Sequence, residues 1–561
     1  MVVEPPALRY VTPPPRSAPH PVPAPARPAG PTVGYWRRLL PVLALLTLVT
    51  RLPSFRPPLW SPDEGYLAVQ ARILAAGGAL YDTVVDRKPP LLPWLYESAF
   101  ALFGDESLYA VKALAVLAQL TTAALLAAIA RGRWGDRAGR TAGVLYPLVS
   151  IGLNPEDAQS ATFEVFILPF TVAAMWCAGR GRWGAAGLAV AGALLTKQTG
   201  GAVLAPVLWL LWNTARTAPA PLLRAAVGRL AAGLVLPVLA VALLTTPSGF
   251  LFWAVTGSGA YATLTGSELH VLSRALANTA LLALACAGLL PPVIRALRTR
   301  GGTGGPGADL WVWLASSSAA VLLGFHFFGH YFLQLLPPLV LLATAALRLL
   351  PRDRLASALL TSACACALFL TWGILAPRAE LSHAQRLADA VRARTAPTDR
   401  VLVWGIHPEI YWLADRAPAS RYLTAGLLTN YSGGRDGPRV GEKYAMAGTW
   451  PVLVDELRAR PPALVVDDSR GKPFAPDRLP TLRALLARGY EPLPGTVDGA
   501  VLYVPSPGEP PDGPSENPSG APAGGASVLR SAVRSPVWSG AASESGAGAG
   551  AASESEPGSG G

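Results

Sequence analysis

The chain has 561 residues, of which 51% are hydrophobic and only 15% charged, with a formal net charge of +12. Soluble proteins carry about 25% charged residues, so this composition lacks the polar surface of a soluble fold. The basic residues form small scattered arginine groups rather than a stripe interleaved with aromatic residues, which argues against a nucleic-acid partner. Apolar segments of roughly twenty residues recur, each long enough to cross about 30 Å of hydrocarbon. We therefore predict a polytopic α-helical membrane protein.

Both ends of the chain are of low complexity. Residues 1–35 are rich in proline, and residues 506–561 are rich in Gly, Ala, Ser, Glu and Pro. Such segments cannot bury enough apolar surface to fold, so we predict two disordered tails, the first of them cytoplasmic. Between them we predict a transmembrane domain over 36–376 and a small extracytoplasmic domain over 377–505.

The transmembrane domain contains about eleven predicted spans. They are 39–55, 108–130, 138–153, 161–179, 184–196, 200–213, 227–247, 272–292, 310–328, 331–349 and 355–376. With the N-terminus in the cytoplasm, as Arg37 and Arg38 suggest, the loops on that side are rich in arginine and poor in acids, as the positive-inside rule requires. An odd number of spans then places everything after Pro377 outside, and we predict a multi-pass protein of the plasma (inner) membrane.

The composition changes after Pro377. The runs "DRVLVWGI", "PPALVVDD" and "GAVLYVP" are typical of strands, and "ELSHAQRLADAVRAR" and "RLPTLRALLARG" have helical spacing. This pattern predicts a small α/β domain. The stretch "VWGIHPE" has one glycine where a dinucleotide-binding loop needs three, so we expect no nucleotide site there.

The first outer loop, 56–107, collects charges in a charge-poor chain, and "SPDE" within it has a structural explanation. Ser61 at N-cap, Pro62 at the first helical position and Glu64 predict a capping box. The helix would carry an apolar stripe and end at Gly77 and Gly78, lying as an amphipathic helix on the membrane surface. The stripe consists of Tyr66, Val69, Ile73 and Leu74.

The same loop also has a chemical interpretation. If Glu64 serves as the cap, Asp63 is the free acid, and a carboxylate at a helix N-terminus stays ionised and can act as a general base. Lys88 precedes two prolines and is therefore held on an extended turn. It is either a snorkelling anchor or a cation for a phosphate. A base and a cation on one outer loop suggest group transfer from a lipid-linked phosphate.

Four segments resemble the signature segments of the C-type membrane glycosyltransferases. They are "PDEGY…DRKPPLLPWLY", "ATFEVFILPF", "LLTKQTG" and "HYFLQLLPPLVLLA". The nearest branch is that of the bacterial relatives of dolichyl-phosphate-mannose protein mannosyltransferases and lipid A aminoarabinose transferase. The resemblance covers residues 35–350 and implies the C-type glycosyltransferase fold, a polyprenyl-phosphate-linked sugar donor and no nucleotide at the site.

The resemblance also implies roles for individual residues. It gives the first-loop acid pair as Asp63 and Glu64, with Asp63 the catalytic carboxylate, and the phosphate-binding lysine as Lys88, with Arg87 a helper. A further family acid falls on Glu164, where many relatives carry Asp and where an interfacial acid is the structural alternative. Relatives often have a basic residue or Tyr before the Tyr that corresponds to Tyr331. Here it is His330, which could bind phosphate only when protonated and is otherwise a hydrogen-bonding residue.

The implied reaction inverts the sugar. Asp63 would take a proton from an acceptor hydroxyl that attacks the anomeric carbon, and Lys88 would stabilise the leaving polyprenyl phosphate. The scheme needs no metal and no cofactor besides the lipid-linked donor, and the sequence shows no His/Cys cluster with ligand spacing. Hexosyl or pentosyl transfer, and a protein, lipid or glycan acceptor, stay open.

Two non-enzymatic functions compete with this one. A transporter or flippase of lipid-linked sugars would carry ionisable residues within its spans and internal repeats, whereas these charges lie at span ends on one side. An assembly scaffold for cell-wall partners would leave Asp63 and Lys88 without a role.

Overall fold

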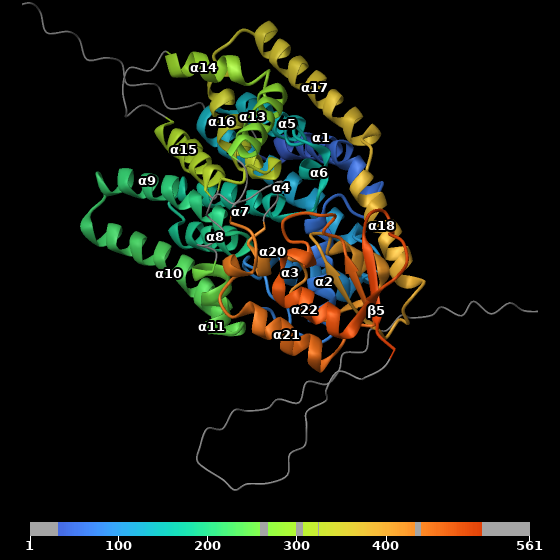
Figure 1. Cartoon of the computed structure of the whole chain (residues 1–561). Helices are drawn as coiled ribbons and strands as arrows, with labels where there is room; N and C mark the ends of the chain where they lie inside the picture. Colours follow the sequence, from blue (N-terminus) through green and yellow to red (C-terminus); the bar gives the residue numbers. More distant parts are fainter. Residues whose placement is uncertain (1–31, 258–267, 299–306, 324, 432–438, 508–561) are drawn as a thin grey trace, which may run out of the picture.

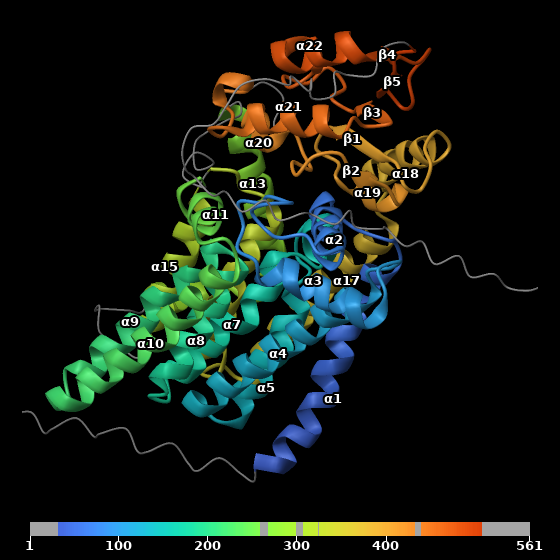
Figure 2. The ribbon, with the colours of Figure 1, turned by 90° about the horizontal axis from the view of Figure 1, so that it is seen from below.

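The computed structural model describes residues 32–257, 268–298, 307–323, 325–431 and 439–507. The predicted disordered tails fall almost wholly on residues 1–31 and 508–561, which lie outside the described residues. The described chain forms a body of helices with a smaller sheet-containing unit stacked on one end (Figure 1; Figure 2).

The helical body runs from Thr32 to Leu375. Its elements are α1 (Thr32–Arg51), η1 (Leu52–Phe55), α2 (Pro62–Ala75), α3 (Leu91–Phe103), α4 (Tyr109–Trp134), α5 (Asp136–Val149), α6 (Pro155–Gln159), α7 (Phe163–Ala178), α8 (Trp183–Thr196), η2 (Gln198–Val203), α9 (Leu204–Ala215), α10 (Ala220–Leu244), α11 (Pro247–Phe250), η3 (Leu251–Thr256), α13 (Glu268–Ala285), α14 (Leu290–Arg298), α15 (Ala308–Leu322), η4 (Gly329–Leu335), α16 (Leu336–Leu347) and α17 (Arg352–Leu375).

Each of the eleven predicted apolar segments carries a helix, although not each helix is long enough to count as a span by itself. In the described part of the chain, five helical segments are long and apolar enough to cross a membrane: Val33–Phe55, Tyr109–Trp134, Ala220–Leu244, Gly329–Leu347 and Arg352–Arg392. Four shorter apolar helices accompany them: Leu91–Phe103, Phe163–Ala178, Trp183–Thr196 and Ala308–Leu322. The helices fit a multi-pass membrane protein, and the count of eleven spans stays a prediction.

Helix α10 shows why this body belongs in lipid. Of its 25 residues only Ala226 and Leu230 are buried, while side chains such as Leu236 and Leu243 are 62% and 65% exposed. An apolar face of this size is unstable in water but costs nothing in hydrocarbon. On its other side α10 packs closely on α8. The absence of a side chain at Gly233 allows this approach, since a Cβ there would collide with the carbonyl oxygen of Gly184.

The C-terminal unit contains a five-stranded sheet in the order β2-β1-β3-β5-β4. Strands β2 and β3 pair with β1 in parallel, and β5 pairs antiparallel with both β3 and β4. The elements are α18 (Ala379–Arg392), β1 (Arg400–Trp404), α19 (Glu409–Ala414), β2 (Ala417–Pro418), α20 (Gly426–Thr429), η5 (Glu442–Tyr444), α21 (Thr449–Ala459), β3 (Leu464–Asp467), η6 (Pro476–Arg478), α22 (Pro480–Gly489), β4 (Tyr490–Pro492) and β5 (Val501–Pro505). The central strands β1 and β3 are almost wholly buried, as their continuous apolar sequences require.

The C-terminal unit docks on α2 through α19. Arg72 of α2 forms ion pairs with Asp105, at 2.6 Å, and with Asp415 just after α19, at 2.9 Å. The indole of Trp412 in α19 donates to the carbonyl of Asp105. Figure 2 shows α2 and α3 at the end of the helical body that faces the sheet.

The apolar stripe of α2 packs on protein, and the predicted position of α2 at the membrane surface stays a prediction. Val69 is 0% and Leu74 7% exposed, because this face of α2 is covered by α3 and α19. The apolar stripe was correctly identified, but its partner is protein. A helical stripe specifies which face is buried and not what buries it.

Gly65 lies at the tightest point of this docking, which leads to a prediction. A Cβ on Gly65 would collide with the Cβ of Glu409 in α19. We expect Gly65→Ala to destabilise the docked unit by about 1–3 kcal/mol through overpacking and to make it more sensitive to proteolysis. Gly228→Ala in α10, where a Cβ meets nothing, is the matched control. A Gly65→Ala protein as stable and protease-resistant as the control would show that α19 can shift away from the new methyl group without loss of stability.

Candidate active site at the start of α2

Helix α2 begins at Pro62, as predicted, but the predicted capping box is wrong. Ser61 has the extended backbone of an N-cap, yet its side chain makes no capping hydrogen bond. The Glu64 carboxylate accepts instead from the backbone N–H groups of Trp60, at 2.5 Å, and of Ala161, at 2.7 Å. Glu64 is 0% exposed, so its position is that of a buried anchor between two segments.

The segment before α7 is fastened to the first loop at several points. The Arg51 guanidinium donates to the carbonyl of Ala158, and the Ser54 hydroxyl donates to the carbonyl of Gln159 at 2.8 Å. Tyr96 of α3 donates to the carbonyl of Ala161 at 2.7 Å. Together with the Glu64 carboxylate, these bonds fix the start of α7 beside the start of α2.

Asp63 and Lys88 meet at the mouth of this arrangement. Lys88 Nζ lies 3.6 Å from Asp63 Oδ1 and 4.1 Å from the centre of the Phe163 ring in α7. The side chains of Lys88 and Asp63 are 27% and 38% exposed, so both remain accessible to a ligand. The Lys88 backbone is held on both sides, by Tyr81 OH donating to its carbonyl and by its own N–H donating to Asp86.

The charges around Asp63 favour its ionised form. Burial by itself would raise the pKa of this carboxyl, but Lys88, then His330 and Lys197, act in the opposite direction and outweigh it. The pKa of Asp63 is therefore lowered, which agrees with the expectation of an ionised acid. We call Asp63, Lys88, Glu164, Lys197, His330, Tyr331 and Asp157 the cluster, because His330 and Lys197 both act on the charge of Asp63.

Glu164 is the second acid of the cluster and is fully buried. It pairs with Lys197, which follows α8, and Lys197 also lies over the ring of Tyr331, 3.9 Å from its centre. Glu164 and Lys197 are 0% and 7% exposed. A buried acid of this kind needs a partner charge, and here the partner comes from another helix.

His330 and Tyr331 enter from η4 and complete the cluster. His330 Nδ1 lies 2.6 Å from Asp157 Oδ1, which also accepts from the His330 backbone N–H. The imidazole is stacked on Phe328, with ring centres 5.7 Å apart and the planes nearly parallel. His330 is therefore a hydrogen-bonding residue, as one alternative predicted, and the acid it contacts would also stabilise its protonated form.

The Arg87 side chain contacts the C-terminal unit. Its guanidinium donates to the carbonyl of Gly426 in the C-terminal unit at 3.3 Å, and its own carbonyl accepts from Gln198 at 2.6 Å. These contacts link the first loop to the C-terminal unit and to η2, and the role of Arg87 as a helper at the donor phosphate stays a prediction.

Two members of the cluster were not among the predicted site residues, namely Lys197 and Asp157. Lys197 lies in the signature segment "LLTKQTG", and Asp157 lies between the predicted spans 138–153 and 161–179. A single lysine at the end of an apolar span was a usable signal for Lys197, because a charge there needs a partner. Asp157 had no comparable signal.

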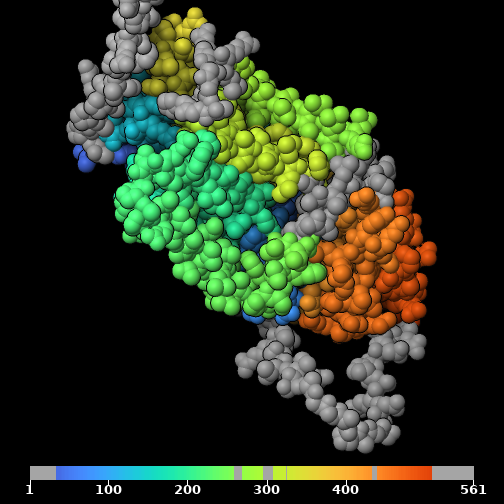
Figure 3. Space-filling model, turned by 90° about the vertical axis from the view of Figure 1, so that its left-hand side faces the viewer, coloured from blue at the N-terminus to red at the C-terminus, as the bar shows by residue number. Residues whose placement is uncertain are grey.

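The space-filling view shows a gap among the green segments of α8 to α11, on the face of the molecule where the orange C-terminal unit is also seen (Figure 3). Atoms coloured as the first hundred residues are visible at its floor, so part of the N-terminal region is reached from this side.

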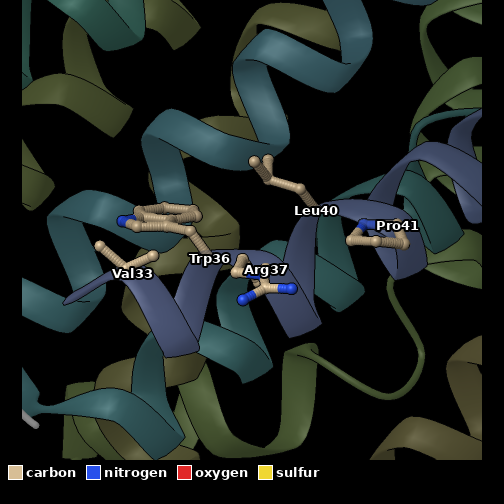
Figure 4. A pocket seen from close by; sticks show the side chains of 5 residues that line it. All are labelled: Val33, Trp36, Arg37, Leu40 and Pro41. Carbon is tan, nitrogen blue, oxygen red and sulfur yellow. The ribbon is translucent and has the colours of Figure 1, made fainter. Parts of the chain in front are cut away.

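A separate pocket lies on α1 and is lined by Val33, Trp36, Arg37, Leu40 and Pro41 (Figure 4). These residues begin α1, at the end of the body opposite the C-terminal unit (Figure 2).

Residues 87–243 match the family model of the dolichyl-phosphate-mannose-protein mannosyltransferases. The resemblance to the C-type membrane glycosyltransferases is confirmed. The mannosyltransferase-like region includes Lys88, Glu164 and Lys197, whereas Asp63 and His330 lie outside the matched residues. A search of curated proteins gives no significant match.

The fold is similar to that of two crystal structures of ArnT from Cupriavidus metallidurans. The apo structure has a TM-score of 0.55 at 17% identity, and the structure bound to undecaprenyl phosphate has 0.53 at 16% identity. In both comparisons the match covers 84% of this chain and 98% of the other. At this identity the likeness concerns the fold, and it extends over nearly the whole of ArnT.

Proposed function

We propose that the chain is an inverting membrane glycosyltransferase that moves a sugar from a polyprenyl-phosphate donor to an acceptor on the outer side of the membrane. The observation that carries the proposal is the ion pair of Asp63 and Lys88, two partly exposed side chains of opposite charge at 3.6 Å. An ionised acid and a lysine side by side supply the base and the phosphate cation that the transfer needs. The mannosyltransferase-like region and an ArnT fold known with undecaprenyl phosphate support this donor class.

In the proposed reaction the Lys88 ammonium leaves the Asp63 carboxylate and binds the donor phosphate instead. The donor is a phosphate diester with one negative charge, the same charge as a carboxylate, so Lys88 can pair with either of them. Asp63, released from its partner, takes the proton of the acceptor hydroxyl as the oxygen attacks the anomeric carbon. The bond from that carbon to the phosphate oxygen breaks on the opposite face, and Lys88 stabilises the charge that develops on the leaving phosphate.

The other members of the cluster have supporting roles in this proposal. Glu164 holds Lys197 over Tyr331, so that a second cation and a phenol face the same space as Lys88. His330 joins them as an imidazolium when Asp157 stabilises its charged form. Glu64 anchors the loop, and Arg87 positions it against the C-terminal unit.

A flippase or transporter of lipid-linked sugars is the competing function. It would bind the same donor through Lys88 but would break no bond. The experiment that separates the two uses membranes containing the full chain and a panel of radiolabelled polyprenyl-phosphate sugars, both pentosyl and hexosyl. Label moved from lipid to an acceptor fraction supports the enzyme and identifies its sugar. Donor binding with no product from any sugar would overturn the proposed transfer in favour of movement across the bilayer.

The cations around Asp63 lead to a prediction about pH. A base works only when ionised, so transfer should fall as the pH drops through the pKa of Asp63, which Lys88 keeps low. Replacing Lys88 with methionine removes the largest of these cationic influences and raises the pKa of Asp63. We therefore expect the acid limb of the residual rate to move to higher pH in Lys88→Met. Lys443→Met, beside Tyr444 in the C-terminal unit, serves as the control. An acid limb that stays in place would exclude Asp63 as the titrating base.

A further inference from the structure

The C-terminal unit holds a second cluster of functional side chains, outside the Asp63 site. His407 follows β1 and Asp468 follows β3, so both lie at the carboxyl ends of adjacent parallel strands. This edge is where open α/β sheets bind ligands. His383 reaches the same place from α18. All three side chains are buried, at 3%, 4% and 0% exposure for His383, His407 and Asp468.

The near nitrogens of the two imidazoles converge on one carboxylate. His383 Nε2 lies 2.8 Å from Asp468 Oδ1, and His407 Nδ1 lies 2.8 Å from Asp468 Oδ2. One ligand atom from each residue falls within 4.8 Å of the others, which is compact enough for a single ion. In the part of the chain that the structure describes, no other group of three His, Cys, Asp or Glu has this geometry.

The far nitrogens of both rings also face acids. His383 Nδ1 lies 2.6 Å from Asp498 Oδ2, and His407 Nε2 lies 3.5 Å from Glu380 Oε2. A neutral imidazole has one N–H and one lone pair, so it cannot donate to acids at both nitrogens. Either both buried rings are imidazolium ions, or their near nitrogens present lone pairs to a cation while the far N–H of His383 donates to Asp498 and that of His407 faces Glu380.

The second arrangement is the one that metal sites use. A histidine ligand usually donates its other N–H to a carboxylate, which fixes the tautomer and the orientation of the ring. Here both rings have that second partner already in place. Both arrangements add two positive charges beside Arg470, whose Nε lies 3.3 Å from Asp468 Oδ1, so the placement of the two rings, with centres 5.5 Å apart, and not the charge favours the metal.

We propose that His383, His407 and Asp468 bind a divalent cation of the Zn²⁺ class, with a water at the fourth position. Two imidazoles and a carboxylate form a ligand set that Zn²⁺ favours. The ion would join α18 to the ends of β1 and β3. Glu409, two residues after His407, lies against Gly65 of α2, so the ion would also stiffen the docking of the C-terminal unit on the helix that carries Asp63.

The first test measures metal in the wild-type chain. The full-length protein is purified in detergent with a histidine-free tag, and its metal content is measured by mass spectrometry before and after treatment with EDTA. We expect about one Zn²⁺ per chain, lost to EDTA and regained from a Zn²⁺ buffer, with a higher melting temperature for the loaded protein. Wild-type protein that takes up no Zn²⁺ would overturn the proposal and leave a network of imidazolium ions.

The second test assigns the ligands. Asp468→Asn and His383→Gln should lose the ion, and Asp498→Asn, which removes only the carboxylate behind His383, should weaken Zn²⁺ binding by about 10–100-fold. His270→Gln, in α13 and outside the cluster, should bind as wild type does. If the ligand variants fail to fold, Zn²⁺ uptake by the wild-type protein and by Asp498→Asn, a change at a partly exposed side chain, still tests the proposal. Undiminished binding in the Asp498 and Asp468 variants would place the metal elsewhere and overturn the assignment.

Discussion

Replacing Asp63 with asparagine is expected to lower the rate of sugar transfer by about 10²–10⁴-fold, the contribution of a positioned general base. Asparagine has nearly the same shape but cannot accept the acceptor's proton. The fold should survive, because the Asp63 side chain is 38% exposed and its ion pair with Lys88 spans 3.6 Å. Partly exposed pairs of this kind contribute little to stability.

The measurement is transfer of label from the active donor by membranes carrying Asp63→Asn, normalised to the amount of folded protein. Asp82→Asn is the matched control, since Asp82 lies on the same loop, is 62% exposed and contacts only Arg421, at 3.8 Å, among the ion pairs of the described residues. We expect the control to transfer at the wild-type rate. Equal transfer by Asp63→Asn would mean that this acid only begins a helix.

The second large effect concerns the buried pair of Glu164 and Lys197. In Lys197→Met the carboxylate of Glu164 loses its partner while remaining fully buried. Breaking a buried pair from one side costs about 3–5 kcal/mol, because it leaves an uncompensated charge. We therefore expect a large fall in the melting temperature of the purified protein, or failure to accumulate in the membrane.

The double variant tests this explanation. Adding Glu164→Gln to Lys197→Met removes the stranded charge and should restore much of the lost stability, although not the activity. Arg392→Met provides the comparison, since its pair with Asp389 is exposed at 49% and 64% and should be worth little. A Lys197→Met protein with wild-type stability, or a double variant no better than the single one, would contradict a buried ion pair.

The positions of the acid and the lysine in the first loop could be predicted from the sequence because their signals are local. Asp63 follows Pro62 and was expected at a helix N-terminus, and Lys88 precedes two prolines and was expected on an extended turn of the same loop. Their contact at 3.6 Å agrees with that expectation. The helical body could be predicted for a similar reason: hydrophobicity is a sum over neighbouring residues, and a long apolar run is informative wherever it occurs.

The partner of Glu64 could not be predicted in the same way. The sequence offered Ser61, three residues away, as the partner of a capping box, whereas the folded chain offers the N–H groups of Trp60 and Ala161. A buried N–H at the start of another helix needs an acceptor more than an exposed helix end does. The hydrogen bonds to Trp60 and Ala161, which form only in the folded chain, therefore replaced the local capping box. The packing of α19 on α2 is likewise a contact between distant segments.

The sequence by itself determined that the chain is a helical membrane protein with an acid and a lysine on the loop after the first apolar segment, because these depend on composition and short-range pattern. Only the tertiary structure decided that Lys197 pairs with Glu164 and that His383, His407 and Asp468 converge. Those residues are separated by tens of residues along the chain and share no periodicity. Their contacts exist because helix packing and parallel strand pairing bring distant segments to one place, which no local pattern encodes.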